Sequence, residues 1–281
     1  MSEAGLPVRS VSTVQARGVM SWREYWPLIV QLTRREIALR YRGSLFGMAW
    51  SLINPLVMLL VYGFVFALVL RARWPGVEGN VGPLGHGVLL LSGLMLHSFL
   101  AECLTRAPSQ IVGNANYVKK VVFPLPIIAV SQWAAAVFHL GVNLGVLLIF
   151  QIVVFGPPPA SIVLAPLALL PLLGFGLGLM WALSAITVYF RDVSQVVGVL
   201  ATLMLFMSPA LYPVEQVPEA LRPLLYLNPL TPALEQWRAL ALWGTLPSAV
   251  SWGVFAVAGL LAAVGGWWCF NRLRRGFADV L

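Results

Sequence analysis

The fold is decided by residues 123–189, which read FPLPIIAVSQWAAAVFHLGVNLGVLLIFQIVVFGPPPASIVLAPLALLPLLGFGLGLMWALSAITVY. Two apolar stretches, 123–155 and 160–189, are separated only by Gly156-Pro157-Pro158-Pro159, which is typical of a tight turn. Each is longer than the about 20 helical residues that cross a hydrocarbon core of ~30 Å. The sequence therefore predicts a hairpin of two membrane-spanning helices that tilt or project beyond the bilayer.

Four more apolar stretches are long enough to cross a membrane: 47–70, 84–105, 193–211 and 249–270. We predict an all-α polytopic membrane protein whose six transmembrane helices occupy residues 47–270. The composition agrees, because 59% of the residues are hydrophobic and only 10% are charged, whereas a soluble domain carries about 25% charged residues. A soluble enzyme is excluded.

The basic residues predict the orientation. With the N-terminus inside, 14 of the 18 Lys and Arg residues fall on one face, and the other four are Arg71, Arg73, Arg222 and Arg238. This positive-inside bias places both termini in the cytoplasm. It also explains the net charge of +8 without nucleic acid as a partner. The first twenty residues lack the apolar core of a signal peptide, so no cleaved signal is expected.

Two segments are neither spans nor plain loops. Residues 21–46, which follow a flexible tail at 1–20, set tryptophans and aliphatic residues against arginines, and this pattern predicts an amphipathic helix lying in the cytoplasmic membrane interface. Residues 213–243 contain two short apolar stretches separated by Asn228-Pro229-Leu230-Thr231-Pro232. They predict a re-entrant pair of short helices at the outer face. Residues 271–281 are expected to form a cytoplasmic tail.

Several kinds of site are missing from the sequence. The only lysines are Lys119 and Lys120, in the context VKKV, so the chain has no GxxxxGK[ST] phosphate loop. Cys103 and Cys269 lie far apart and form no CxxC motif. Three scattered histidines, with no metal-ligand spacing, predict packing or pore-lining roles and no metal site: His86, His97 and His139. We expect no cofactor in this chain.

Charged groups are nearly absent from the spans, where a charge costs at least ~2.5 kcal/mol. Glu102 is the only acid inside an apolar run, and Arg106 follows it at i+4, so a local ion pair is predicted. Proton or sodium coupling is therefore disfavoured, and energy should come from outside this chain.

Polar residues recur near one face of the third span: Gln132, His139, Asn143 and Gln151. Two interpretations stay open, hydrogen bonding between helices and a polar stripe facing a conduit. Two GxxxG pairs, Gly141/Gly145 and Gly174/Gly178, predict close packing of the hairpin.

Four stretches follow one another in a characteristic order. They read LTRREIALRYRGSLFGMAWSLINPLVMLLVYGFVF (Leu32–Phe66), NANYVKKVVFPLPIIAV (Asn114–Val130), YFRDVSQVV (Tyr189–Val197) and SPALYPVEQVPEALRPLLYLNPLTPALEQWR (Ser208–Arg238). Together they resemble the membrane subunits of ATP-binding-cassette exporters of the ABC-2 permease class, in the branch that exports polysaccharides and teichoic acids. The resemblance covers most of the chain from about residue 28 onward.

The resemblance implies a homodimer of this permease in the bacterial inner membrane, bound to two copies of a separate cytoplasmic ATPase that carries ATP and Mg. Its cargo would be a lipid-linked glycan of the O-antigen or capsular kind, and membrane lipids would surround it. A drug or small-lipid exporter of the same class is an alternative. A membrane-embedded polyprenol-phosphate glycosyltransferase is another, but Asp192 with Glu102 is a poor set of acidic groups for it.

The resemblance also assigns roles to residues. A coupling helix at about 109–121 would dock on the ATPase, and the short helices at 213–243 would gate the exit. The coupling residues are Asn114, Asn116, Tyr117, Lys119, Lys120, Phe123 and Pro124. The interface helix contributes Arg34, Arg35, Glu36, Arg40, Tyr41 and Arg42. The outer gate contains Tyr212, Pro213, Tyr226, Asn228, Pro229 and Trp237.

For the basic residues among these, membrane topology alone is an alternative explanation. Lys119 and Lys120 contact either the ATPase or anionic headgroups, or they serve only as positive-inside anchors. Arg40 and Arg42 are candidates for a lipid pyrophosphate, because guanidinium pairs bidentately with phosphate, although topology alone also puts arginines there. Aromatic faces stack on sugars, and the candidates for a substrate path are Trp50, Tyr62, Phe64, Phe66 and Phe206. Most aromatic residues of a membrane protein are interface or packing residues, so this interpretation stays open for each of them.

Overall fold

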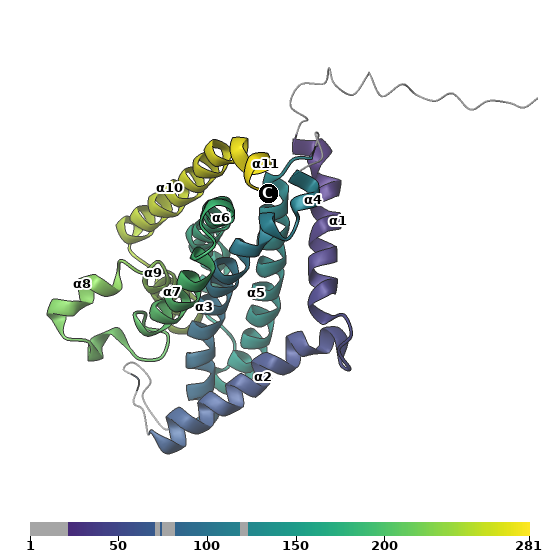
Figure 1. Ribbon diagram of the computed structural model, residues 1–281. Helices are drawn as coiled ribbons and strands as arrows, with labels where there is room; N and C mark the ends of the chain where they lie inside the picture. The colour runs from purple at the N-terminus through teal and green to yellow at the C-terminus, as the bar shows by residue number, and fades with distance from the viewer. Residues whose placement is uncertain (1–21, 71–73, 75–81, 119–122) are drawn as a thin grey trace, which may run out of the picture.

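The computed structural model describes residues 22–70, 74, 82–118 and 123–281, and every regular element in these residues is a helix (Figure 1). The predicted hairpin is present as α5 (Pro126–Phe155) and α6 (Ala165–Tyr189), with a short 3-10 helix, η4 (Ala160–Leu164), before α6. Gly156 makes the turn with φ +86°, a left-handed conformation that glycine adopts without a steric cost. The all-α membrane fold is thus confirmed.

Five helical segments are long and apolar enough to cross a membrane: Gly47–Val69, Gly82–Val112, Pro126–Phe155, Ala160–Tyr189 and Ala249–Val280. The first comprises η2 (Gly47–Ala49), α2 (Trp50–Gly63) and η3 (Phe64–Val69). The predicted fifth span is α7 (Val193–Phe206), which is apolar but has only 14 residues. The count of six spans therefore stays a prediction.

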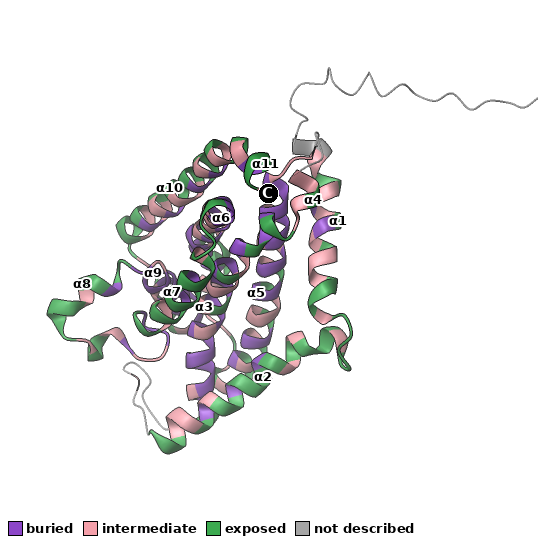
Figure 2. Cartoon of the chain, in the orientation of Figure 1, coloured by how far each residue is buried: buried purple, intermediate pink, exposed green. Residues whose placement is uncertain are grey.

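The centre of the molecule is α3 (Gly82–Val112), whose residues are mostly buried (Figure 2). It packs against α2, α5, α6 and α7. It continues seven residues beyond the predicted end of its span at 105. The outward faces of α2 and α7 and of α10 (Ala249–Leu273) are apolar and exposed, as in Leu60, Val199 and Leu261. Such faces suit helices surrounded by lipid.

The two glycine pairs do not pack the hairpin together, which corrects the prediction. Gly174 and Gly178 face α10 instead of α5, and a Cβ on Gly178 would collide with the backbone of Ala262. Gly141 and Gly145 have open space where a Cβ would lie. A GxxxG pattern indicates that a helix can be approached closely, but it does not identify the approaching helix.

The predicted amphipathic helix is present as α1 (Trp22–Tyr41). Ile29 and Leu32 pack against Ile127 at the start of α5, and Thr33 Oγ1 donates to the Ser131 carbonyl at 3.3 Å. The contacts advance together along both helices, so α1 runs beside the first half of α5 (Figure 1). Its position relative to the membrane interface stays a prediction.

The outer segment contains short helices, as predicted: α8 (Arg222–Leu225), α9 (Leu230–Arg238) and the π-helical η7 (Ala239–Trp243). Whether they re-enter the membrane stays a prediction. The C-terminal residues form α11 (Phe277–Val280), which folds back on the bundle. Phe277 is fully buried against Phe270, and the Tyr189 hydroxyl donates to the Leu273 carbonyl at 2.9 Å. The predicted tail is thus packed and helical.

Candidate functional site

A cavity of about 700 Å³ lies between the C-terminal end of α1, α2, α3 and α5. Its walls combine charged, polar and aromatic side chains, which is unusual for the interior of so apolar a chain. These are Arg40, Tyr41, Trp50, Asn54, Tyr62, His97, Glu102, Arg106, His139 and Asn143. A concave site with a few convergent polar groups is the usual form of a ligand site.

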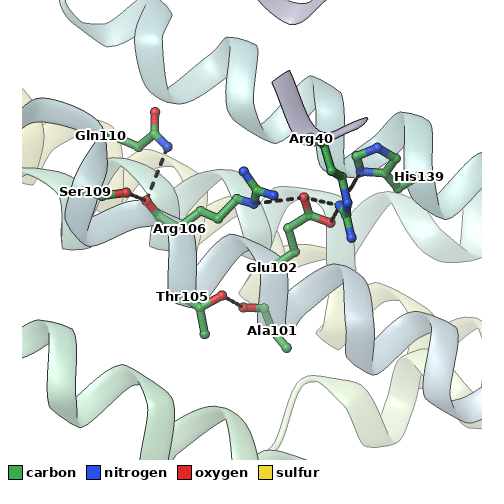
Figure 3. A network of polar contacts seen from close by, with 8 residues as sticks. All are labelled: Arg40, Ala101, Glu102, Thr105, Arg106, Ser109, Gln110 and His139. Carbon is green, nitrogen blue, oxygen red and sulfur yellow. Dashed lines mark hydrogen bonds and ion pairs between the residues drawn. The ribbon is translucent and has the colours of Figure 1, made fainter. Parts of the chain in front are cut away.

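An ion cluster around Glu102 forms one side of the cavity (Figure 3). Arg40 Nη1 of α1 donates to both Glu102 oxygens at 2.7 Å, and Arg106 Nε lies 3.2 Å from Oε1. Arg40 Nη1 also lies 2.8 Å from His139 Nδ1 of α5. The same His139 Nδ1 lies 3.4 Å from Glu102 Oε2, so the imidazole faces both the guanidinium and the carboxylate. Three helices thus meet at one carboxylate.

The cluster lies well inside α3, away from the end of that helix. Glu102 lies ten residues before the end of α3, which is ~15 Å at 1.5 Å per residue. The Glu102–Arg106 pair confirms the prediction of a local ion pair. Arg40 and His139 were not predicted as its partners, because a helical pattern indicates a face but not what packs on it. The sequence predicted for His139 a packing or pore-lining role and a place in the polar stripe, but no contact with Glu102.

The polar stripe of α5 divides into two parts. His139 and Asn143 line the cavity. Gln151 lies farther along, buried, and its amide donates to the Ala241 carbonyl of η7, which is a hydrogen bond between elements. Gln132 is buried outside the cavity.

The remaining residues of α1 divide between solvent and the segment after α3. Arg34 and Arg42 are exposed. Arg35 pairs with Glu36 at 2.8 Å, which raises the pKa of the arginine, and donates to the Tyr117 hydroxyl at 3.4 Å. Tyr41 packs edge-on against His139 with ring centroids 6.0 Å apart. The helix is therefore tied at Arg35 to the predicted coupling segment and at Arg40 to the cavity.

The predicted coupling helix at 109–121 is not continuous. Its first part is the end of α3, and after a turn the short α4 (Ala115–Val118) follows. The Asn114 side chain donates to the Gln110 carbonyl at 2.8 Å, which satisfies an end group of α3. The rings of Tyr117 and Phe123 lie 4.5 Å apart.

The other coupling residues are less informative. Asn116 is exposed and Pro124 is half-buried at the start of α5. Lys119 and Lys120 lie outside the described residues.

The predicted path aromatics fall into two groups. Trp50 and Tyr62 line the large cavity. Phe66 and Phe206 line a second cavity of about 320 Å³, together with Trp74 and Tyr212. The structure places Phe64 in neither, with 57% of it exposed.

Side chains of the predicted outer gate bind the end of α7. Asn228 Nδ2 donates to the Met204 and Met207 carbonyls at 2.7 and 3.0 Å, and the Tyr212 hydroxyl donates to the Phe206 carbonyl at 2.7 Å. The last carbonyls of a helix lack partners within the helix, and these bonds satisfy those at the end of α7. Asn228 Oδ1 also accepts from the Leu230 amide at the start of α9, at 3.1 Å.

Arg238, at the end of α9, binds the chain that follows α7. Its guanidinium donates to the carbonyls of Pro209 at 2.6 Å and Ala210 at 3.4 Å, and on α3 to the Leu89 carbonyl at 3.2 Å and the Ser92 hydroxyl at 3.1 Å. It also stacks over Trp74, 4.8 Å from the ring centroid. The arginine is buried and has no ion pair among the described residues. The sequence predicted only a basic residue on the outer face.

The remaining predicted gate residues are Trp237, Pro213, Pro229 and Tyr226. Trp237 is buried in the core, Pro213 is buried beside the second cavity, and Pro229 precedes α9. Tyr226 donates to Glu235 at 2.9 Å, and partial burial together with this carboxylate raises the pKa of the tyrosine to about 12.

Long apolar helices around a polar and aromatic cavity are the architecture of a membrane transport protein. The chain belongs to the ABC-2 type transporter family, whose model matches residues 27–242.

Named relatives agree with this family. One O-antigen export system permease protein RfbA of Klebsiella pneumoniae is 29% identical over 255 residues, which are 90% of this chain and 95% of the relative. The protein of the same name from Myxococcus xanthus is 28% identical over 258 residues, 91% of this chain and 96% of the relative.

Proposed function

We propose that this chain is the membrane-spanning subunit of an ATP-driven exporter that moves a lipid-linked polysaccharide, of the O-antigen or capsular kind, across the bacterial inner membrane. Two copies of the chain form the passage, and two copies of a separate cytoplasmic subunit supply ATP hydrolysis with Mg. Membership of the ABC-2 family over residues 27–242 carries this proposal. The near full-length relatives named as O-antigen permeases support the cargo.

The cavities favour a glycan over a drug as cargo. Trp50 and Tyr62 stand among hydrogen-bonding side chains in the large cavity. An amphiphilic aromatic surface of this kind stacks on the C–H faces of sugars, while the polar groups exchange hydrogen bonds as a polymer slides. A glycosyltransferase is disfavoured, because Glu102 already serves two arginines and Asp192 is exposed at the start of α7.

The direct test is export in vesicles. The chain and its ATP-binding subunit, reconstituted together, should transfer a lipid-linked glycan across the bilayer only with ATP, and the chain alone should hydrolyse none. Transport by the chain alone under an ion gradient would overturn the proposal.

A second test addresses coupling. Alanine at Tyr117, Lys119 and Lys120 together should lower export about tenfold or more while the membrane-inserted protein persists, because the loop would no longer pass rigid-body motion to α1 and α3. Alanine at Arg274 and Arg275, which are exposed at the other end of the chain, removes two positive charges and serves as the control. Equal export by the triple variant and the control contradicts the coupling role.

A further inference from the structure

The outward face of α10 is apolar along the length of the helix and ends in a tryptophan and an arginine. Its exposed side chains recur at helical spacing: Val250, Val254, Val257, Leu261, Val264, Trp268 and Arg272. The opposite side of the helix, which includes Gly259 and Gly266, packs on α6. Figure 1 shows α10 at the edge of the bundle. No other element among the described residues covers its outward face.

The length of this face matches the thickness of a bilayer. Val250 and Trp268 are 18 residues apart, which is ~27 Å at 1.5 Å per residue, close to the ~30 Å of a hydrocarbon core. Tryptophan favours the membrane–water interface, because its ring is apolar and its N–H is polar. Arg272 lies one turn beyond Trp268, ~6 Å farther. The face therefore presents aliphatic side chains, an aromatic ring and a cation in the order of the parts of one phospholipid.

Positive charge without a partner gathers at this end of α10. Four exposed guanidinium groups have neither an ion pair nor a hydrogen bond among the described residues: Arg191, Arg272, Arg274 and Arg275. The bond from the Tyr189 hydroxyl to the Leu273 carbonyl holds the end of α6 beside the end of α10, which places Arg191 at the same end of the molecule. The exposed acids there, Asp192 and Asp279, form no ion pair with these arginines. The charge is thus available to an anionic partner.

The turn after α10 holds a second arginine beside Arg272. It is η8 (Arg274–Gly276), and it is followed by Phe277, which is fully buried and packs edge-on against Phe270 with ring centroids 5.7 Å apart. Arg275 follows Arg272 by three residues, so the two side chains lie on one side of the chain. Two planar guanidinium groups on one side can each donate two hydrogen bonds to a phosphate.

We propose that Trp268, Arg272 and Arg275 bind the headgroup of an anionic phospholipid whose acyl chains lie along the apolar face of α10. Basic residues directly beyond the end of a membrane helix attract anionic headgroups, and each one adds to the affinity. The occupant is a lipid because the arginines continue a face that is aliphatic over a membrane's thickness. A soluble protein would meet only the last turn of that face.

This site is separate from the proposed export path. No residue of α6 or α10 lines either cavity. The inference therefore goes beyond the proposed function and does not depend on the cargo. It also leaves Arg274 and Arg275 as a valid control for export, because their loss changes a lipid on the outside of the bundle and not the wall of the cavity.

The test is native mass spectrometry of the full-length chain in neutral detergent, titrated with phosphatidylglycerol or with phosphatidylcholine of the same acyl chains. The wild type should bind phosphatidylglycerol about tenfold more tightly than phosphatidylcholine. The double variant Arg272→Gln/Arg275→Gln should lose this preference and keep its affinity for phosphatidylcholine, because only the headgroup charge is no longer recognised. The matched control is Arg34→Gln/Arg42→Gln on α1, which removes the same charge from two exposed arginines and should retain the preference.

A tryptophan variant locates the lipid on α10. Trp268→Ala should weaken the binding of both lipids several-fold, because the ring contacts a part that both share. Trp26→Ala on α1 is the matched control, since Trp26 is 64% exposed and Trp268 67%, and it should change neither affinity. Equal affinities of Trp268→Ala and the wild type would place the lipid elsewhere and contradict the proposal.

The arginine variants separate a built site from general attraction. Equal loss of preference in the two double variants would mean that positive charge anywhere on this side recruits the lipid, and it would overturn the site, as would equal affinity of the wild type for the two lipids. Unchanged lipid binding by Arg272→Gln/Arg275→Gln, together with lost association with the ATP-binding subunit, would assign these arginines to that protein instead. All substituted side chains are exposed, so the variants should keep the thermal unfolding midpoint of the wild type, which is measured in the same detergent.

Discussion

Arginines hold together two regions of this bundle in opposite ways. At the cavity, Arg40 and Arg106 share a carboxylate, keep unused donors and are partly exposed. In the outer segment, Arg238 is buried and binds three backbone carbonyls and a hydroxyl. A side-chain partner can be exchanged for another anion, while a carbonyl belongs to the fold. The difference marks the first region as adjustable and the second as fixed.

The largest loss of stability is expected from a substitution in the fixed region, at Arg238. Arg238→Gln should lower stability by about 3–5 kcal/mol, because the buried carbonyls of Pro209 and Ala210 lose their guanidinium donor and the Ser92 hydroxyl loses a partner. The shift in the thermal unfolding midpoint in detergent measures it.

The matched control for this variant is Arg222→Gln in the same outer segment, where the arginine is partly exposed, and its cost should stay below about 1 kcal/mol. Similar midpoints for the two variants would show that Arg238 is no anchor.

A smaller effect is expected where Asn228 closes the end of α7. Asn228→Ala removes two bonds to α7 carbonyls and one to the Leu230 amide, which should cost about 2 kcal/mol. Hydrogen exchange should rise at the end of α7 and in the chain up to Pro213, and remain unchanged in α5. Uniform exchange across the bundle would mean that the bonds at Asn228 do not hold this end locally.

The sequence predicted the elements of both regions better than their connections. The hairpin and its turn at Gly156 followed from hydropathy and a run of prolines, since both are local signals. The Glu102–Arg106 pair followed from spacing on one helix. Arg40 and His139 come from other helices, so only packing brings them to Glu102.

The contacts of the outer segment could not be predicted from the sequence for a different reason. Its key bonds run from side chains to backbone carbonyls, as from Asn228 to Met204, and backbone acceptors leave no mark in the sequence. The α6–α10 contact was missed because Gly178 indicates a close approach by some helix and α10 is distant in the chain. Long-range partners therefore required the structure.

The smallest loss of stability is expected at the cavity, from a substitution of Glu102. Glu102→Gln should cost about 1 kcal/mol or less, although it removes the acid shared by two arginines, because both arginines can turn their charge toward the cavity and its water. The amide keeps the size of the side chain and one acceptor. Thermal unfolding in the same detergent as for Arg238→Gln gives a direct comparison. If Glu102→Gln proves as damaging as Arg238→Gln, the carboxylate holds the helices as firmly as the backbone carbonyls hold Arg238, and the first region is not adjustable. A small cost means that the two arginines do not depend on this carboxylate, because water in the cavity can solvate their charge in its place.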